Sequence, residues 1–249
     1  MSALLLENKI VVITGNPYGI GRVSAALFAA EGAQVVCIDD SRAGWAPTGA
    51  SASALPQFIA DVSDRQAVAA VVSACERTLE RVDVLFNLAG RAVKQSFENT
   101  TEATWNEMIG RNLSAAFVCS REFLPLMKKA PGGSIINHAS IDGFLGNPSL
   151  AAYSAGKGGV IPLTHVMAHE LGKYRLRVNC ISTGGIRDGS ARPEDAARVR
   201  VTPLSRMGTP EDVARVALFL ACELSSYVNG ANIVVDGGRT AITQGCYDD

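Results

Sequence analysis

The chain has 249 residues, enough for one sizeable hydrophobic core, and nothing along it resembles a linker, so we expect a single domain over residues 1–249. Hydrophobic residues make up 47% and charged residues 19%, which is typical of a globular protein and excludes a disordered one. With 23 basic and 24 acidic residues the chain has no basic surplus for nucleic acid, and it has no apolar run of the roughly 18 residues that a membrane span needs.

Apolar, strand-like runs alternate with helical patterns along the chain. The predicted strands cover residues 9–14, 34–39, 57–60, 82–88, 133–138, 177–181 and 232–235. The predicted helices begin near residue 20 and then cover 64–80, 104–129, 153–173 and 210–221. Near-continuous apolar strands separated by helices are typical of a parallel sheet with both faces covered. We therefore predict an α/β fold, a Rossmann-like doubly wound parallel sheet of about seven strands, with residues 41–56 mostly in a loop.

The turn after the first predicted strand is rich in glycine, with the sequence Thr14-Gly15-Asn16-Pro17-Tyr18-Gly19-Ile20-Gly21. Glycine lets the backbone turn tightly and approach a pyrophosphate, whose charge then lies at the N-terminus of the following helix. The same pattern also suits an ordinary turn between a strand and a helix, so on its own it leaves both interpretations open.

An acidic residue, Asp39, ends the second predicted strand, 18 residues after Gly21. At that distance a carboxylate would accept hydrogen bonds from the adenosine ribose hydroxyls of NAD and repel the additional phosphate of NADP. Asp40 would add to this repulsion, whereas Arg42 is a counter-argument, because an arginine could receive that phosphate. The alternative is an acidic strand end that faces water.

A tyrosine and a lysine, Tyr153 and Lys157, are four residues apart in a predicted helix, so their side chains share one face. Free tyrosine has a pKa of about 10 and is a poor base at neutral pH, but an adjacent cation favours the phenolate and lowers that pKa. The pattern Y-x-x-x-K is common by chance, so it gains meaning only beside the other motifs.

In combination these motifs resemble the short-chain dehydrogenase/reductase family, in the branch of about this chain's length, over residues 9–238. The matching segments are residues 14–21, Asp61-Val62, Asn87-Leu88-Ala89-Gly90, Asn112, Ser140 at 13 residues before Tyr153, and Asp236-Gly237-Gly238. The resemblance implies an NAD-dependent oxidoreductase that moves hydride between nicotinamide and a secondary alcohol or ketone.

The resemblance also implies four catalytic roles. Tyr153 exchanges a proton with the substrate oxygen as general acid and base, and Lys157 lowers the pKa of Tyr153 and holds the nicotinamide ribose. Ser140 donates a hydrogen bond to the substrate oxygen. Asn112 supports a water molecule that links Lys157 to solvent.

Cofactor and substrate contacts carry over in the same way. The expected NAD contacts are Gly15, Tyr18, Gly19, Ile20, Gly21, Asp39, Asp61, Val62, Asn87, Ala89, Gly90, Tyr153, Lys157, Gly184 and Ile186. The expected substrate contacts are Ser140, Tyr153, Asp142 and Arg91.

Three residues depart from the family pattern. Leu88 replaces the second asparagine of N-N-A-G, and Thr183 stands where the family has proline before Gly184, which frees one φ angle near the nicotinamide. Pro162 falls inside the predicted catalytic helix, where a proline can produce a kink. None of these changes removes a catalytic group.

Two other functions remain open. A 3-oxoacyl carrier-protein reductase would share the catalytic set but normally uses NADPH, against which Asp39 argues. A non-catalytic protein that senses NAD is the second alternative, against which the intact catalytic set argues.

The remaining expectations concern partners and location. His165 and His169 lie four residues apart with no third ligand apparent, so no metal site is expected. The apolar long helices, by resemblance, pair between subunits of a homotetramer or homodimer. Six scattered cysteines without a C-x-x-C pair, and an N-terminus without a basic signal-peptide region, favour a cytoplasmic protein.

Overall fold

The computed structural model describes residues 4–15, 19–40, 57–190 and 192–241, and within them a single parallel sheet of seven strands. The strands are β1 (Ile10–Thr14), β2 (Gln34–Asp39), β3 (Gln57–Ile59), β4 (Val84–Asn87), β5 (Ser134–Ser140), β6 (Arg177–Thr183) and β7 (Asn232–Val235). Their order across the sheet is β3-β2-β1-β4-β5-β6-β7. Each predicted strand is found, with ends that differ by at most two residues.

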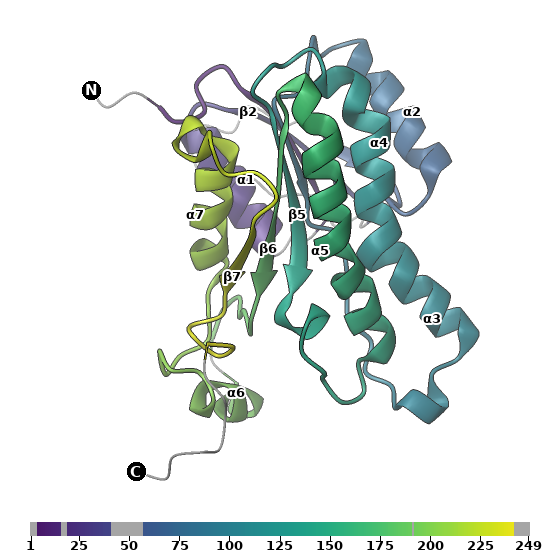
Figure 1. The fold of residues 1–249 in the computed structure, drawn as a ribbon, viewed down its shortest axis with the longest axis vertical. Coiled ribbons are helices and arrows are strands. Elements are labelled where there is room, and N and C mark those ends of the chain that lie inside the picture. The colour runs from purple at the N-terminus through teal and green to yellow at the C-terminus, as the bar shows by residue number, and fades with distance from the viewer. Residues whose placement is uncertain (1–3, 16–18, 41–56, 191, 242–249) are drawn as a thin grey trace.

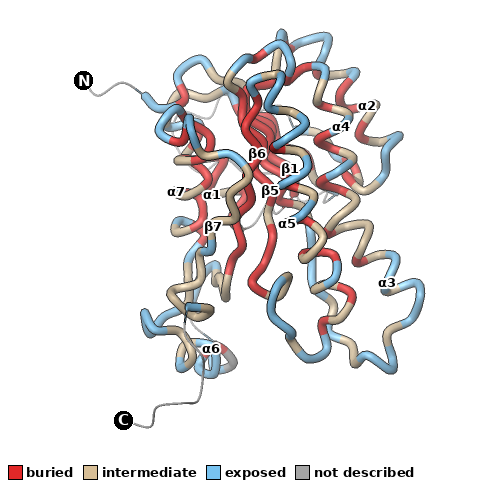
Figure 2. Tube along the Cα trace, in the orientation of Figure 1, coloured by how far each residue is buried: buried red, intermediate tan, exposed pale blue. Residues whose placement is uncertain are grey.

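Helices cover both faces of the sheet (Figure 1). One face carries α2 (Arg65–Glu76), α4 (Ala115–Met127) and α5 (Ala151–Leu171), and the other carries α1 (Ile20–Ala30) and α7 (Pro210–Ala221). The sheet between these layers is the most deeply buried part of the molecule (Figure 2), with a hydrophobic cluster on each side. This arrangement confirms the predicted doubly wound α/β fold. No described helix is long and apolar enough to cross a membrane.

Two short helices, α3 (Glu102–Ile109) and α6 (Ala196–Arg200), lie towards the end of the molecule to which the strands point (Figure 1). The chain leaves β1 towards β2 and β3 and then returns to β4, on the other side of β1. In open α/β sheets, ligands bind beyond the carboxyl ends of the strands where the strand order reverses. The fold therefore places the glycine-rich turn after β1 and the Asn87–Gly90 segment after β4 at such a point.

The long helix predicted over residues 104–129 is interrupted. α3 ends at Ile109, a π-helical turn covers Gly110–Ser114, and α4 begins at Ala115. A π turn inserts one residue into an otherwise α-helical run, which a 3.6-residue periodicity does not resolve. The proline in the catalytic helix, in contrast, does not end it, because α5 continues through Pro162 to Leu171.

A buried chain of polar side chains joins the sheet to α4 and α5. The amide nitrogen of Asn87 (β4) donates to the side-chain oxygen of Asn137 (β5) and to the hydroxyl of Ser120 (α4), each at 2.9 Å. The amide nitrogen of Asn137 donates to the hydroxyl of Thr164 (α5), also at 2.9 Å. Buried polar groups are costly unless they are bonded, so these contacts favour one placement of the two helices on the sheet.

Candidate active site and cofactor cavity

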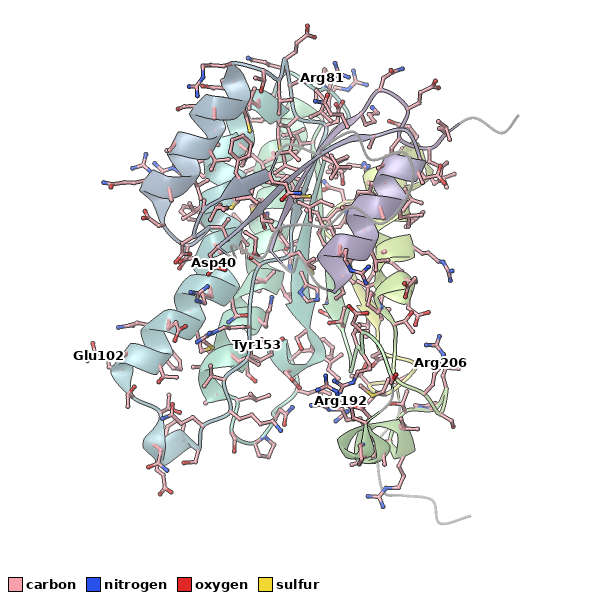
Figure 3. The ribbon with its side chains drawn as sticks, turned by 180° about the vertical axis from the view of Figure 1, so that it is seen from behind. Asp40, Arg81, Glu102, Tyr153, Arg192 and Arg206 are labelled. Carbon is pink, nitrogen blue, oxygen red and sulfur yellow. The ribbon has the colours of Figure 1, made fainter. Side chains whose placement is uncertain are left out.

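Four polar side chains expected to act in catalysis converge where β5 ends. Ser140 is the last residue of β5, Tyr153 and Lys157 lie in the first turns of α5, and Asn112 lies in the π turn before α4. Ser140, Lys157 and Asn112 are buried, and Tyr153 is partly buried. Figure 3 shows Tyr153 near the carboxyl ends of the strands. The structure thus brings together residues that are up to 45 positions apart in the chain.

Glycines in α5 allow this convergence. A Cβ on Gly158 would lie 2.7 Å from the carbonyl oxygen of Gly143, in the turn after Ser140, and a Cβ on Gly156 would lie 3.0 Å from the Cβ of Asn112. Glycine inside a helix costs about 1 kcal/mol relative to alanine. We did not identify this signal in the sequence, although glycines on both sides of Lys157 indicate a close approach of neighbouring backbone.

The ammonium of Lys157 is almost fully enclosed, with 2% of the residue exposed. Its Nζ donates to the carbonyl oxygen of His138 at 2.8 Å. Burial disfavours the charged form and lowers the pKa of Lys157 to about 7. An ammonium has three N–H donors, and the carbonyl of His138 accepts from one of them.

Lys157 and Asn112 come close together at Gly90. A Cβ at Gly90 would lie 2.6 Å from Oδ1 of Asn112 and 3.0 Å from Nζ of Lys157, so both side chains pack against this glycine and a larger residue would not fit. The amide nitrogen of Asn112 donates to the carbonyl oxygens of Arg91 and Met108, whereas its Oδ1 is buried and has no hydrogen-bond partner within the described ranges. An acceptor of this kind, beside an ammonium, suits a bound water molecule.

The phenol of Tyr153 has an electrostatic environment that differs from the sequence expectation. Burial raises the pKa of Tyr153, a hydrogen bond with Ser140 lowers it, and the charge of Asp142 raises it, with a net upward shift. We had expected Lys157 to lower this pKa. The pKa shift is upward because removing the phenolate from water costs more free energy than the hydrogen bond with Ser140 restores.

A second polar pair, His138 and Thr183, lies beside the catalytic cluster. Nε2 of His138 (β5) is 3.1 Å from the hydroxyl of Thr183, the last residue of β6. Burial and the charge of Lys157 lower the pKa of His138 well below its usual value, so the ring is neutral at pH 7. From the sequence, we predict only that Thr183 begins a less constrained loop. The contact instead ties the start of that loop to β5.

A cavity of about 140 Å³ lies at the carboxyl ends of β1, β2 and β4. It is lined by Gly15, Asp39, Asp40, Asp61, Val62, Ser63, Ala89, Gly90, Arg91 and Arg111. Gly15 has φ +79°, and a Cβ there would lie only 2.4 Å from the Cα of Ala89, so the close approach of these two loops requires glycine. Six of the expected NAD contacts share this cavity, which suits the adenosine half of a dinucleotide.

The other expected cofactor residues surround it. Gly19, Ile20 and Gly21 form the N-terminal end of α1, where backbone N–H groups favour a phosphate. Gly184 follows β6 and donates its N–H to the carbonyl of Val235, and Ile186 pairs with Gly208. Tyr18 and Arg42 lie outside the described residues, and the side-chain nitrogen of Asn87 bonds towards the helices.

The two residues expected only at the substrate occupy different places. Arg91 forms an ion pair with Glu107 at 2.7 Å and lines the cofactor cavity together with Asp39. Asp142 donates its backbone N–H to the Ser140 hydroxyl at 3.1 Å, so it lies beside the catalytic cluster. In the described part of the chain, no group of three or more His, Cys, Asp or Glu side chains could hold a metal ion.

A residue that we did not predict, Arg111, completes the cavity wall. Its Nη1 lies 2.6 Å from Oδ2 of Asp40, and its Nε lies 3.3 Å from Oε1 of Glu107. We had counted Asp40 as an additional negative charge towards NADP, but Arg111 compensates that charge. The only sequence signal was an arginine directly before Asn112.

Comparison with known proteins now identifies the family. A family model described as enoyl-(acyl carrier protein) reductase matches residues 15–240. The chain belongs to the short-chain dehydrogenase/reductase family. It is 38% identical to the 3-oxoacyl-[acyl-carrier-protein] reductase of Thermotoga maritima over 241 residues, which cover 94% of this chain and 98% of that one.

Two further comparisons agree with this assignment. The chain is 35% identical to the NADP-dependent (R)-specific alcohol dehydrogenase of Lentilactobacillus kefiri, over 95% of this chain and 98% of that one. The structure of the aldohexose dehydrogenase of Thermoplasma acidophilum superposes with a TM-score of 0.89 over 100% of both chains, at 24% identity, and so shares the fold. Membership of the family makes this protein an oxidoreductase that uses a nicotinamide cofactor.

The enclosed Lys157 leads to a stability prediction. Because its pKa falls from 10.5 to about 7 on folding, the unfolded chain binds more protons between these two values, and the ligand-free protein gains stability as the pH rises through that window. Lys157→Met removes this dependence. We therefore expect the variant to unfold at a higher temperature than the wild type at pH 6 to 7, with the difference shrinking towards pH 10. A difference in melting temperature that is independent of pH would contradict the enclosed ammonium.

Proposed function

We propose that this protein is an NAD-dependent oxidoreductase that transfers hydride between nicotinamide and a secondary alcohol or ketone. The observation that carries the proposal is the convergence of Ser140, Tyr153, Lys157 and Asn112 beside the cavity that Asp39 lines. The bound nicotinamide would supply or accept the hydride. The residues of the chain would bind and orient the cofactor and the substrate, and they would transfer the proton.

The proposed proton path begins at Tyr153. Its hydroxyl gives a proton to the substrate oxygen during reduction and takes it back during oxidation. The phenol of Tyr153 is protonated in the ligand-free protein, and burial, which raises its pKa, makes it a weaker acid than free tyrosine. We propose that the bound cofactor and Lys157 favour loss of this proton during the reaction. Ser140, which is hydrogen-bonded to Tyr153 in the same cluster, is placed to donate a second hydrogen bond to the substrate oxygen.

Lys157 and Asn112 are proposed to bind the ribose and to pass the proton on. Among the described residues, the ammonium donates to the carbonyl of His138, and its other N–H groups suit the nicotinamide ribose hydroxyls and a water molecule. Oδ1 of Asn112 lies close to the ammonium beside Gly90 and has no partner within the described ranges, so it would accept a hydrogen bond from that water. The unpartnered acceptor supports the relay expected from the family resemblance.

The residues also fit the adenosine half of NAD. Asp39 ends β2 and lines the cavity with Asp61 and Val62, as expected for a carboxylate that accepts hydrogen bonds from the ribose hydroxyls. A 2′-phosphate would bring about −1.5 to −2 charges against Asp39. We therefore propose NAD rather than NADP.

A carrier-protein reductase is the second candidate, supported by the similarity to the Thermotoga maritima enzyme. It would use the same catalytic residues on a 3-oxoacyl thioester. Turnover of such a thioester with NADPH, and none of secondary alcohols with NAD, would favour it. A non-catalytic NAD-sensing protein is disfavoured by the complete catalytic set, and any turnover that depends on Tyr153 excludes it.

We further propose a single cytoplasmic domain over residues 1–249 that assembles as a homotetramer or homodimer. The continuous sheet supports the single domain. Five cysteines are buried free thiols, which suits a reducing compartment. Phe117 in α4 and Val166 in α5 are large apolar side chains about half exposed, as expected if these helices contact another subunit.

The catalytic proposal is tested by Tyr153→Phe. We expect turnover of secondary alcohols with NAD to fall at least 10²-fold, the usual range for losing a general acid and base, while the dissociation constant for NAD changes little. Steady-state kinetics and calorimetry measure the two quantities. Retention of more than about a tenth of the wild-type rate would exclude Tyr153 as the proton donor.

The cofactor proposal is tested by comparing kcat/KM for NAD and NADP in one buffer. Hydrogen bonds to a charged group contribute about 1.5–3 kcal/mol, so we expect the wild type to prefer NAD at least tenfold, which corresponds to about 1.4 kcal/mol. Asp39→Ala should reduce this ratio. Equal use of both cofactors by the wild type would show that Asp39 is only a solvated strand end.

The assembly is tested by light scattering at micromolar concentration. We expect a native mass of four times the 26.1 kDa subunit, or of twice this mass. The apolar side chains of α4 and α5 should then become less accessible than they are in the single chain. A monomer would rule out the proposed pairing of these helices.

A further inference from the structure

The wall of the cofactor cavity contains a network of ion pairs that connects its two ends. Arg111 contacts Asp40 at 2.6 Å and Glu107 at 3.3 Å, and Glu107 contacts Arg91 at 2.7 Å. In Figure 3, Asp40 lies next to the helical run that carries Arg111. The network thus joins the segment after β2 to the π turn.

The charge of Arg111 also reaches the floor of the cavity. Burial alone would raise the pKa of Asp61, but two hydrogen bonds from Ser63 and the charge of Arg111 together lower it. The described lining carries three carboxylates, on Asp39, Asp40 and Asp61, and two guanidiniums, on Arg91 and Arg111. Both guanidiniums are held by acidic side chains, so the cations of this wall are neutralised within the protein.

A guanidinium that is free to bind phosphate favours NADP binding, whereas one that is paired with a carboxylate does not. Arginine is a preferred partner of phosphate because its planar fork offers parallel N–H donors. A guanidinium that already bonds to a carboxylate must break that bond before it can receive a phosphate. Asp40 would therefore disfavour NADP mainly by occupying Arg111, because its own negative charge is compensated by the ion pair.

We propose that Arg111 is a specificity-determining residue for the adenosine end of the cofactor, and that Asp40 and Glu107 keep its charge away from a 2′-phosphate. The inference rests on the proposed function, because it assumes that the cavity binds adenosine with the ribose against Asp39. It adds a determinant outside the strand end, on the π turn directly before Asn112. Removal of Asp40 should release Arg111 towards a 2′-phosphate.

The test measures binding of two nucleotides that represent the adenosine ends of the two cofactors. These are 5′-AMP for NAD and adenosine 2′,5′-bisphosphate for NADP, measured by calorimetry on the full-length protein. Binding is the readout because Arg111 adjoins Asn112, so turnover could change for another reason. The variants are Asp40→Asn, Arg111→Gln and their combination.

We expect Asp40→Asn to strengthen binding of the bisphosphate about tenfold and to change binding of 5′-AMP less than about twofold. The double variant should lose this gain and bind the bisphosphate about as weakly as the wild type, because the released guanidinium is absent. Arg65→Gln is the matched control. This substitution breaks an ion pair with Glu122 at 2.8 Å, outside the residues that line the cavity. It should change the binding affinity of neither nucleotide.

A double variant that binds the bisphosphate as tightly as Asp40→Asn would overturn the inference, because the gain would then come from removing direct repulsion by Asp40. No gain from Asp40→Asn alone would overturn it as well. Thermal unfolding of each variant establishes that it is folded before binding is compared. Equal binding of the two nucleotides by the wild type would contradict the proposed NAD preference, but the comparison of variants would still decide the role of Arg111.

Discussion

The enclosure of the Lys157 ammonium is the constraint on which the rest of the site depends. A lysine that is almost fully buried is unfavourable unless acceptors surround its charge, and the chain provides one at the carbonyl of His138. Burial lowers the pKa of Lys157 to about 7, so the bond to His138 offsets only part of the lost hydration. The site therefore favours molecules that bring more acceptors, and the ribose hydroxyls of a dinucleotide are suitable.

The local structure around Lys157 follows from this enclosure. Gly156 and Gly158 let the π turn and the loop after Ser140 approach α5 within contact distance, at a cost in helix propensity. The π turn places the side chain of Asn112 beside Gly90 and Lys157, at the expense of regular helical bonding. The buried bonds that Asn87 donates to Ser120 and Asn137 donates to Thr164 offset these local costs by holding α4 and α5 on the sheet.

Much of this architecture is predictable from the sequence, because it depends on local patterns of apolar and polar residues. The strands are continuous apolar runs, and the proposed catalytic tyrosine and lysine lie one helical turn apart. What could not be predicted depends on contacts between distant residues. The ion pair of Asp40 and Arg111 spans 71 positions, and the hydrogen bond between His138 and Thr183 spans 45. The raised pKa of Tyr153 reflects burial, which only the packed fold determines.

The central claim, that Lys157 is enclosed and poorly solvated before the cofactor binds, is tested most directly by titrating its side chain. NMR of protein labelled with ¹³C and ¹⁵N at lysine would follow the side-chain resonances with pH, and the signal missing from Lys157→Met would identify the residue. The account predicts a titration in the ligand-free protein near pH 7, far below the usual 10.5. A titration near pH 10 would show that water reaches the ammonium and would contradict the account.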